Sequence, residues 1–391
     1  MTEIDPNEID PNETEPMVQD SGLEPEPHGP LDELADAILA GHRPAASPVQ
    51  TNSDELTAVL EYLIGAGGEL NPQSLRVFSD LSAAQAEQVR RDWPLIPAQR
   101  REAVLTYLTT LAEEELDLHL GPLLRVLLGD SEPTIRRLAM EGLWEDLGGD
   151  LIGPLVQLLY NDEDAGVRAA AAQALGPFVL AGELDELDTA LSMRAEEALL
   201  AVLLQPEEDT DVRRNALESI AYSGEMGVRQ LIEDAYYDAD EAMRVSALTA
   251  MGRSADIRWR GLVRAELLNP SPAMRGEAAR ACGELDARAA TPELITLLED
   301  EELFVRLNAI AALGQIGGKE AREALRAHKD AGDVSDPLED EAVELALEEL
   351  LFSQDNDIAL FDEDELLETW EDDPWDLPYG HDDDDLGEYS S

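Results

Sequence analysis

Two ten-residue stretches far apart in the chain share one pattern. Residues 305–314 read Val-Arg-Leu-Asn-Ala-Ile-Ala-Ala-Leu-Gly, and residues 167–176 read Val-Arg-Ala-Ala-Ala-Ala-Gln-Ala-Leu-Gly. In both, a valine precedes the arginine directly, an alanine follows it at the third position and a leucine at the seventh. These offsets lie on one face of an α-helix, so each stretch predicts a helix with one buried side.

The same pattern recurs along the chain when it is aligned on its arginine. Alanine stands three positions after each arginine, and the positions one before, four after and seven after it are mostly apolar. The last four arginines are spaced 31 residues apart. A constant period of this size is typical of helical repeats, in which each unit packs on its neighbours. The aligned arginines are Arg100, Arg136, Arg168, Arg213, Arg244, Arg275 and Arg306.

Each repeat is predicted to be a helix–turn–helix pair, whose members we call the first and the second helix. The arginine lies on the second helix, and an apolar segment upstream, such as residues 294–298, predicts the first. Four positions before the arginine stand residues that commonly cap helices, namely Asp164, Asp209, Asp240 and Ser271. Glycines eight positions after it are expected to end the helix in a left-handed turn; these are Gly176, Gly252, Gly283 and Gly314. The predicted fold is therefore all-α, an α-solenoid held together mainly by apolar stacking.

An acidic residue usually precedes the arginine by six positions. The acids are Asp130, Asp162, Glu207, Asp238 and Asp300, and Asn269 takes this place once. The first repeat has the arginine without the acid; after the last repeat, Asp333 supplies the acid and Glu339 replaces the arginine. This asymmetry predicts an arginine–acid ladder, in which each arginine reaches the acid of the following repeat, from Arg100 with Asp130 to Arg306 with Asp333. In the alternative, each acid only tightens its own turn.

An acid followed by Val-Arg-x-x-Ala-x-x-Ala-Leu-Gly resembles bacterial HEAT repeats, including the HEAT-like repeats of phycobilisome lyases. The resemblance covers about residues 95–350, most clearly at residues 167–176 and 305–314. It implies a superhelix whose second helices form a binding face. It says little about function, because one scaffold serves many roles.

Charge and composition divide the rest of the chain. The formal net charge is −60, and residues 1–30 hold nine acids without a Lys or Arg. We predict a disordered acidic arm over 1–52 with a short helix at 31–40, a helical cap over 53–94, the solenoid over 95–352 and an acidic, aromatic-containing tail over 353–391. The single cysteine, Cys282, favours a reducing compartment, and the first residues lack the apolar region of a signal peptide, so we expect a cytoplasmic protein.

The sequence offers little that points to catalysis. The five histidines show no metal-binding spacing, and neither a phosphate-binding loop nor a nucleophile elbow is present. Cys282 shares its offset with core leucines, which indicates packing. We therefore expect no enzyme activity, no metal and no cofactor. An acidic chain without a cationic face is a poor ligand for nucleic acid, and no apolar stretch is long enough to span a membrane.

Two groups of residues are candidates for binding a protein partner. One lies on the outward side of the second helices, at positions +1, +2 and +5 from the arginine: Arg137, Glu141, Arg214, Glu218, Ser246, Glu277, Arg280 and Asn308. The other is in the tail, where Trp370, Trp375 and Tyr379 stand among acids. A solvated surface and a solubilising tail are the simpler alternatives.

Three functions remain open at this point. The first is a non-catalytic scaffold or adaptor that binds proteins on the solenoid surface and through the tail. The second is an acidic chaperone that shields a basic protein, which strong salt dependence of binding would favour. The third is an enzyme or subunit similar to the phycobilisome lyases. The sequence specifies neither the partner nor the oligomeric state.

Overall fold

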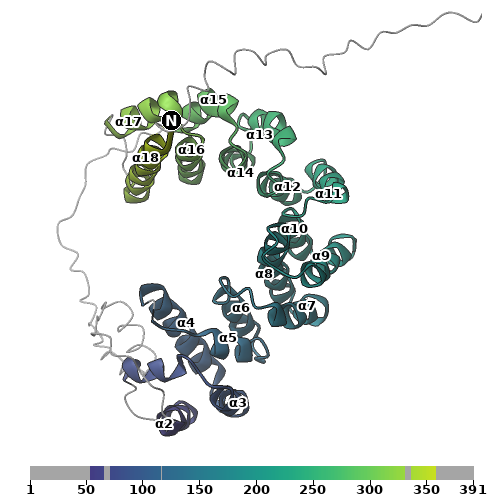
Figure 1. Ribbon diagram of the computed structural model, residues 1–391, viewed down its shortest axis with the longest axis vertical. Helices are drawn as coiled ribbons and strands as arrows, with labels where there is room; N and C mark the ends of the chain where they lie inside the picture. Colours follow the sequence, from purple (N-terminus) through teal and green to yellow (C-terminus); the bar gives the residue numbers. More distant parts are fainter. Residues whose placement is uncertain (1–52, 66–70, 116, 331–335, 358–391) are drawn as a thin grey trace, which may run out of the picture. The chain divides into compact units, whose positions relative to one another are not determined.

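The computed structural model describes residues 53–65, 71–115, 117–330 and 336–357. Within these residues the regular structure is helical and no strand is present, so the predicted all-α solenoid of paired helices is confirmed (Figure 1). None of the described helices combines the length and the apolar character needed to cross a bilayer. The predicted arm over 1–52 with its helix at 31–40, and Asp333, Trp370, Trp375 and Tyr379, lie outside the described residues.

The described chain divides into two units between Asp146 and Leu147. In the first unit, α3 packs against α5 and α4 packs against α6, so a helix pair begins at Ala83, before the predicted start of the repeats at residue 95. Phe78 and Trp93 meet edge to face in its core. The helices of this unit are α2 (Ser53–Ile64), η1 (Pro72–Phe78), α3 (Ala83–Asp92), η2 (Trp93–Leu95), α4 (Ala98–Glu114), α5 (Gly121–Leu127) and α6 (Pro133–Glu141).

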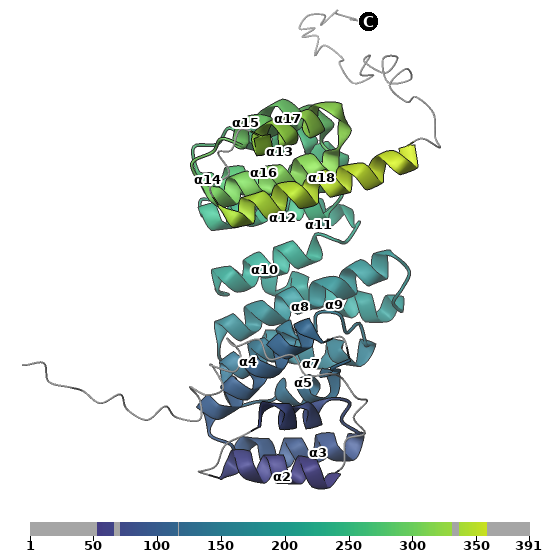
Figure 2. The ribbon, with the colours of Figure 1, turned by 90° about the vertical axis from the view of Figure 1, so that its left-hand side faces the viewer.

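The second unit consists of successive helix pairs. Each second helix packs against its own first helix and against the next second helix, and Figures 1 and 2 show the second helices side by side in one row. The first helices are α7 (Ile152–Asn161), α9 (Thr189–Leu203), α11 (Met226–Tyr236), α13 (Arg260–Glu266), α15 (Thr291–Leu297) and α17 (Gly318–Asp330). The second helices are α8 (Ala165–Glu183), α10 (Thr210–Ile220), α12 (Glu241–Arg253), α14 (Pro272–Glu284), α16 (Leu303–Ile316) and α18 (Pro337–Asp357). Short 3₁₀ turns η3 (Gly149–Leu151), η4 (Ile257–Trp259) and η5 (Arg288–Ala290) precede three first helices.

The second helices begin where their caps place them. Asp164 accepts a hydrogen bond from the N–H of Val167, three residues on, at 3.0 Å. Asp209 and Asp240 cap α10 and α12 by accepting from the N–H two residues on, each at 2.9 Å. Ser271 precedes α14 without a capping hydrogen bond from its side chain, and Pro272 follows at the first helical position, where a proline is tolerated. The apolar offsets are buried as predicted, with Val305, Ala309, Ile310 and Leu313 all inaccessible to solvent.

The repeated glycines serve a different purpose from the predicted one. Gly252, Gly283 and Gly314 lie inside their helices, and a left-handed backbone occurs three residues later, at Ala255, Asp286 and Gly317. A Cβ added to Gly283 would lie 3.0 Å from the Cα of Ala312 on the next second helix. The same close approach occurs at Gly314, where a Cβ would lie 3.1 Å from the Cα of Ala346. The expected left-handed helix end is therefore wrong, because these glycines let two helix backbones approach each other.

Candidate protein-binding edge

Most arginines of the ladder donate a hydrogen bond to a carbonyl oxygen in the turn that precedes their own helix. Arg168 Nη1 donates to the carbonyl oxygen of Asp162 at 2.8 Å, and Arg306 Nη1 donates to that of Asp300 at 2.9 Å. Arg136, Arg244 and Arg275 repeat this contact six residues back. The acid also tightens its turn, since Asp300 Oδ1 accepts the N–H of Glu302 at 3.0 Å. The alternative role of the acids is thus present in the structure, beside the contacts between repeats.

The contact between repeats is clearest at Arg275 and Asp300, which the spacing pairs. Arg275 Nε and Nη2 donate to the two carboxylate oxygens of Asp300 at 2.8 and 3.0 Å. Burial alone would raise the pKa of Asp300, but the hydrogen bonds from Arg275 and from the Glu302 N–H lower it overall. One arginine therefore joins its own turn and the next one.

The predicted pairing of Arg100 with Asp130 is wrong, because Arg101 takes this place. Arg101 Nη1 lies 2.5 Å from both carboxylate oxygens of Asp130, and the indole N–H of Trp93 donates to the same carboxylate at 2.9 Å. Arg100 instead donates to the carbonyl oxygens of residues 63 and 65. The reason is a shift of one residue in this repeat, where Leu105 and Leu108 are buried and set the face of α4.

Two further pairs use a neighbouring or later acid. Arg168 pairs with Glu208 at 2.8 Å instead of Glu207, because the turn before α10 is longer and turns Glu207 outward. Arg306 donates at 2.9 and 2.8 Å to Glu339, the residue that occupies the arginine position of the last repeat. The predicted pairing of Arg306 with Asp333 lies outside the described residues. His328 lies 3.0 Å from the same carboxylate. Glu339 stands in the first turn of α18, where the helix dipole also favours an acid.

The ladder is interrupted in the middle of the second unit. Arg213 donates to the carbonyl oxygen of Leu203 at 3.2 Å and forms no ion pair with Asp238. In the repeat that follows Arg244, the ladder position is taken by the uncharged Asn269. Arg244 instead lies 3.6 Å from the carboxylate of Glu241 on its own helix. The pairing of Arg136 with Asp162 would join the two units and stays a prediction.

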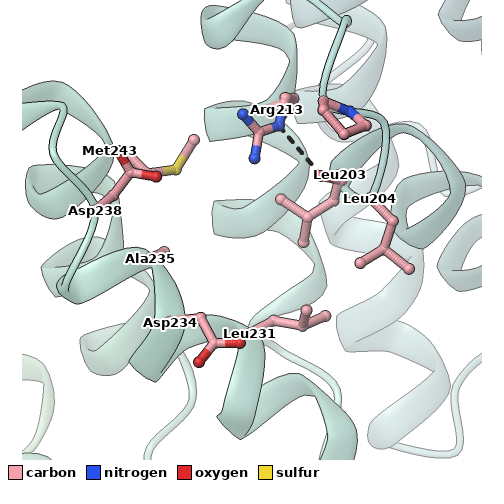
Figure 3. A pocket seen from close by; sticks show the side chains of 9 residues that line it. Leu203, Leu204, Arg213, Leu231, Asp234, Ala235, Asp238 and Met243 are labelled. Carbon is pink, nitrogen blue, oxygen red and sulfur yellow. Dashed lines mark hydrogen bonds between the residues drawn. The ribbon is translucent and has the colours of Figure 1, made fainter.

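A hollow of about 230 Å³ lies at this interruption (Figure 3). Arg213 lines one side beside Leu203 and Leu204, and Asp238 and Met243 line the opposite side. Because the guanidinium and the Asp238 carboxylate do not meet across it, both remain available at the rim. The hollow combines apolar walls with two opposite charges.

This hollow belongs to an edge made of the turns between first and second helices, which we call the turn edge. It comprises residues 160–164, 204–211, 237–241, 268–272 and 298–302, which hold 14 Asp or Glu and no Lys or Arg. Neighbouring turns touch, since Ser271 Oγ donates to Glu241 at 2.8 Å. The first residue of four of these segments is a large exposed apolar side chain: Tyr160 is 46% exposed, Leu204 63%, Tyr237 71% and Leu268 73%.

This row of apolar residues on the turn edge was not recognised from the sequence. Each residue stands at the end of a first helix, where the apolar pattern predicts burial. Tyr237 and Leu268 directly precede the ladder positions Asp238 and Asn269, and this spacing is the signal that could have revealed them. These side chains stand one per repeat along one edge, and exposed apolar side chains that gather with polar residues around them can mark an interaction site, so we take the turn edge as the leading candidate for a protein-binding site.

Comparison with known families agrees with the repeat geometry. A family model described as HEAT repeats matches residues 120–195 and 262–347. These two stretches of the chain match HEAT repeats.

Proteins similar to this chain include one sequence and several solved structures. The "Uncharacterized phycocyanin operon protein Z" of Pseudanabaena tenuis is 30% identical over 138 residues, which span 34% of this chain and 63% of that relative. The complex of CpcE and CpcF of phycocyanin lyase from Nostoc is 18% identical with a TM-score of 0.39, covering 59% of this chain and 94% of that chain. Importin beta is 15% identical with a TM-score of 0.39, covering 76% of this chain and 46% of that chain.

Several polar residues that the sequence assigns to a partner surface instead join neighbouring HEAT repeats. Arg214 Nε donates to Ser246 Oγ at 2.9 Å, and Ser246 Oγ donates to Glu218 Oε1 at 2.5 Å, which links α10 to α12. Asn308 Nδ2 donates to the carbonyl oxygen of Gly276 at 2.9 Å, which links α16 to α14. Ser246 is 0% exposed and is therefore a packing residue, not a partner-contacting one.

The remaining candidates on the second helices differ in their surroundings. Glu277 accepts a hydrogen bond from Thr249 at 2.5 Å and pairs with Arg280 on its own helix. Arg137 and Glu141 lie exposed on α6 of the first unit. Positions +2 and +5 of one second helix turn toward the next, because alanine and glycine bring these helices close together. The sequence pattern could not distinguish this contact from exposure.

Two observations concern metal binding and the single cysteine in the described residues of these repeats. Within them, no group of three or more His, Cys, Asp or Glu is arranged to hold a metal ion. Cys282 is buried, and burial raises the pKa of its thiol to about 12, so the reactive thiolate is disfavoured.

Proposed function

We propose that this HEAT-repeat protein is a non-catalytic binding protein whose turn edge holds a basic, amphipathic segment of a partner protein. The observation that carries the proposal is the exposed row of Tyr160, Leu204, Tyr237 and Leu268 among acids. Apolar contacts would supply most of the affinity, and the carboxylates would select a basic partner. This form of the scaffold hypothesis keeps the expected cytoplasmic location.

The apolar and the acidic side chains of the turn edge would contribute to binding in different ways. Tyrosine is enriched among residues that dominate the binding energy of interfaces, and truncation of such a residue typically costs about 2 kcal/mol or more. Surface carboxylates contribute mainly through the rate and selectivity of association, and salt weakens them. Glu163, Glu241 and Glu301 lie exposed on the edge beside the apolar row.

The hollow at the interruption of the ladder would receive an apolar side chain of the partner. Leu204 and Leu231 supply apolar walls, and Asp238 stands at the rim without a pair to Arg213. A lysine or arginine next to that apolar side chain would then meet Asp238. Long cationic side chains suit such a site, because their stems lie along apolar surface while the charge stays at the rim.

The test uses a defined probe and two variants of the full chain. The probe is a fluorescent amphipathic peptide of about 18 residues in which leucine and lysine alternate with helical period. The edge variant combines Tyr237→Ser with Leu268→Ser. Its matched control combines Leu184→Ser with Met226→Ser, which are equally exposed on the same unit but at the other ends of the helices.

We expect the edge variant to bind the probe about tenfold or more weakly and the control to stay within about twofold of the unchanged chain. A shared loss in both variants, or no loss in either, would show that the edge does not hold the segment. Affinity capture from the native host with the same two variants then identifies the partner, which the edge variant should lose and the control should retain.

Salt separates the scaffold from the acidic chaperone. A chaperone that shields a basic protein through charge alone would lose nearly all binding at about 0.5 M salt, because screening then acts within a few ångströms. Binding through the apolar row would persist in part, and it would disappear only with the Tyr237 and Leu268 substitutions.

The name of the relative from Pseudanabaena tenuis supports a second candidate function. That relative is named for a phycocyanin operon, and the phycobilisome lyase alternative would place this chain in bilin attachment. Incubating the purified chain with phycocyanobilin and recording the visible spectrum tests it. A red-shifted, intensified absorbance would favour a lyase-like role, and an unchanged spectrum would count against it.

A further inference from the structure

Part of the surface at the opposite ends of the helices is rich in arginine. The loops after α10, α12 and α14, with the helix starts that follow them, are residues 222–229, 254–264 and 285–291, and they hold five arginines and three carboxylates in a chain of net charge −60. The loop after α8, residues 184–188, differs, because it holds three carboxylates and no Lys or Arg. We call this surface the arginine edge. Its loops are contiguous, since Arg229 lies 3.5 Å from Asp256 and Arg260 Nε donates to the carbonyl oxygen of Leu285 at 2.7 Å.

The arginines remain open to solvent despite their local ion pairs. Arg258 pairs with Asp256 at 2.6 Å and its side chain is still 59% exposed; Arg288 lies 3.3 Å from Asp286 and its side chain is 69% exposed. A guanidinium has five N–H donors, so one carboxylate leaves several donors unused. These side chains can therefore bind further anions.

Two hollows lie between these arginines. One of about 200 Å³ is lined by Arg229, Arg258 and Trp259, together with the acidic residues Glu225 and Asp256. Trp259 is buried, and its indole N–H has no acceptor among the described residues. The other, of about 450 Å³, is lined by Arg260, Arg264, Arg288 and Asp286 and by the small residues Gly261, Ala287, Ala289 and Ala290. The second hollow therefore combines an apolar lining with three guanidinium groups and one carboxylate.

We propose that the arginine edge binds the segment Trp370–Asp376 of the same chain. Residues 358–391 contain 14 acids and no Lys or Arg, and this segment places two tryptophans around three consecutive acids and an additional Asp376. An indole in the larger hollow stacks on guanidinium groups, an arrangement that arginine favours over lysine. The flanking carboxylates then accept hydrogen bonds from the exposed arginines.

The geometry favours this segment over the acidic N-terminal residues. Residues 1–52 contain no Phe, Trp or Tyr, so they cannot supply an aromatic side chain to the hollow. Helix α18 runs parallel to α16, because Glu339 meets Arg306 and Ala346 meets Gly314 in the same order along both helices. The C-terminal end of α18 therefore points toward the arginine edge.

The reach of the chain is sufficient. From α18 to α14, whose end leads into residues 285–291, two helix spacings of about 10 Å must be covered. The 13 residues from 358 to 370 span up to about 43 Å when extended. The segment can therefore dock within one molecule, on the edge opposite to the one in the proposed function, and the two proposals can fail separately.

The experiment places a nitroxide on the full chain through Thr369→Cys, next to Trp370. Cys282 is fully buried, so the nitroxide reagent should react with the new cysteine at position 369 and not with Cys282. Methyl-labelled protein reports where the nitroxide lies. We expect the Ile257, Ala287 and Ala289 signals to lose more than half of their intensity, and the Ala239 signal on the turn edge to stay unchanged.

The matched variants change pairs of equally exposed arginines. Arg258→Glu with Arg288→Glu should abolish the broadening. Arg90→Glu with Arg91→Glu, whose side chains are 60% and 68% exposed in the first unit and also have acidic neighbours, should leave it intact. Salt at about 0.5 M should restore the signals in the unchanged chain.

Each other outcome overturns the proposal. Broadening at Ala239, uniform weak broadening, or no broadening would place the segment elsewhere. Broadening in a mixture of spin-labelled chains and separate methyl-labelled chains would show that a second copy supplies the segment. If both pairs of arginine substitutions changed the broadening equally, the segment would respond only to the net charge of the chain and would have no specific site on the arginine edge.

Discussion

Removal of the Glu339 carboxylate tests how the ladder fixes the last repeat. Glu339 is 2% exposed and accepts two hydrogen bonds from Arg306, at 2.9 and 2.8 Å, with His328 at 3.0 Å. Breaking a buried ion pair by removing one partner typically costs about 3–5 kcal/mol. Arg306 retains the carbonyl oxygens of its own turn and some solvent, so we expect about 2–3 kcal/mol for Glu339→Ala.

This loss should be local to the contact between α16 and α18. In a repeat array an end unit can open without the rest of the chain, so amide hydrogen exchange of residues 337–351 is the appropriate assay. About 2–3 kcal/mol corresponds to exchange that is roughly 30- to 150-fold faster. Global unfolding is less informative here, because repeat arrays can depart from two-state behaviour.

The control is Glu323→Ala on the adjacent helix α17. Glu323 lies 3.8 Å from Lys319, and both side chains are largely exposed, so its loss should change exchange by about twofold at most. If Glu339→Ala accelerates exchange of α18 by less than about threefold, or no more than the control does, the ladder does not hold the end repeat. Combining Glu339→Ala with Arg306→Met separates the pair's coupling from the cost of an unpaired arginine.

Three further predictions address other parts of the fold. In thermal melts, Gly283→Ala should lower the free energy of unfolding by about 1–2 kcal/mol, because the new Cβ would meet the backbone of the next helix. Gly261→Ala is the control: position 261 has open space around it, so the helix-favouring alanine should raise the free energy of unfolding by up to about 1 kcal/mol. Asp130→Ala should cost about 3–5 kcal/mol in urea unfolding followed by tryptophan fluorescence, since it leaves Arg101 buried without its carboxylate; a loss under about 1 kcal/mol would contradict this. The hydrogen bonds from Arg306 lower the pKa of Glu339 in the folded chain. The stability that Glu339 contributes is therefore complete above the ordinary glutamate pKa of about 4.3, and it is lost as the pH falls through the lower pKa of the folded state. Exchange of α18 should therefore be steady from about pH 7 to 5, after correction for intrinsic rates, and rise in more acidic solution only while Glu339 is present.

The repeat architecture could be predicted because helical geometry fixes which positions are buried. Ala309, Ile310 and Leu313 follow Arg306 at offsets that a 3.6-residue period places on one face, and all three are fully buried. The period of the arginines then gives the number and order of the helix pairs. Both features belong to single helices and their neighbours, which a sequence pattern describes well.

The partners in the ladder depend on register, which the sequence leaves ambiguous. Arg100 and Arg101 are adjacent and chemically identical, and only the burial of Leu105 and Leu108 decides which of them faces Asp130. Glu207 and Glu208 differ in the same way. Such a choice depends on how one repeat lies against the next.

The glycines show a second limit of the sequence. A small residue near a helix end suits a left-handed turn and a close helix contact equally well. Gly283 faces Ala312 on another helix, and that contact appears only when both backbones are placed. The exposed row on the turn edge escaped prediction for the opposite reason, since Tyr237 and Leu268 fit a buried pattern yet lie beyond the last covered turn.

The ladder also explains how a chain of net charge −60 has two different edges. Arg168, Arg275 and Arg306 direct their guanidinium groups at carbonyl oxygens and carboxylates between the turns, so their charge is neutralised inside the turn edge. The exposed acids around them then face the solvent, apart from Glu241 and Asp211, which pair with Arg244 and Arg214. On the arginine edge, Arg258 and Arg288 have no such carbonyl partners and stay exposed. The electrostatic attraction of a partner therefore depends on the charge of the edge that it approaches and not on the net charge of the chain. The reason is that fields from exposed charges more than about 10 Å away are screened at physiological salt.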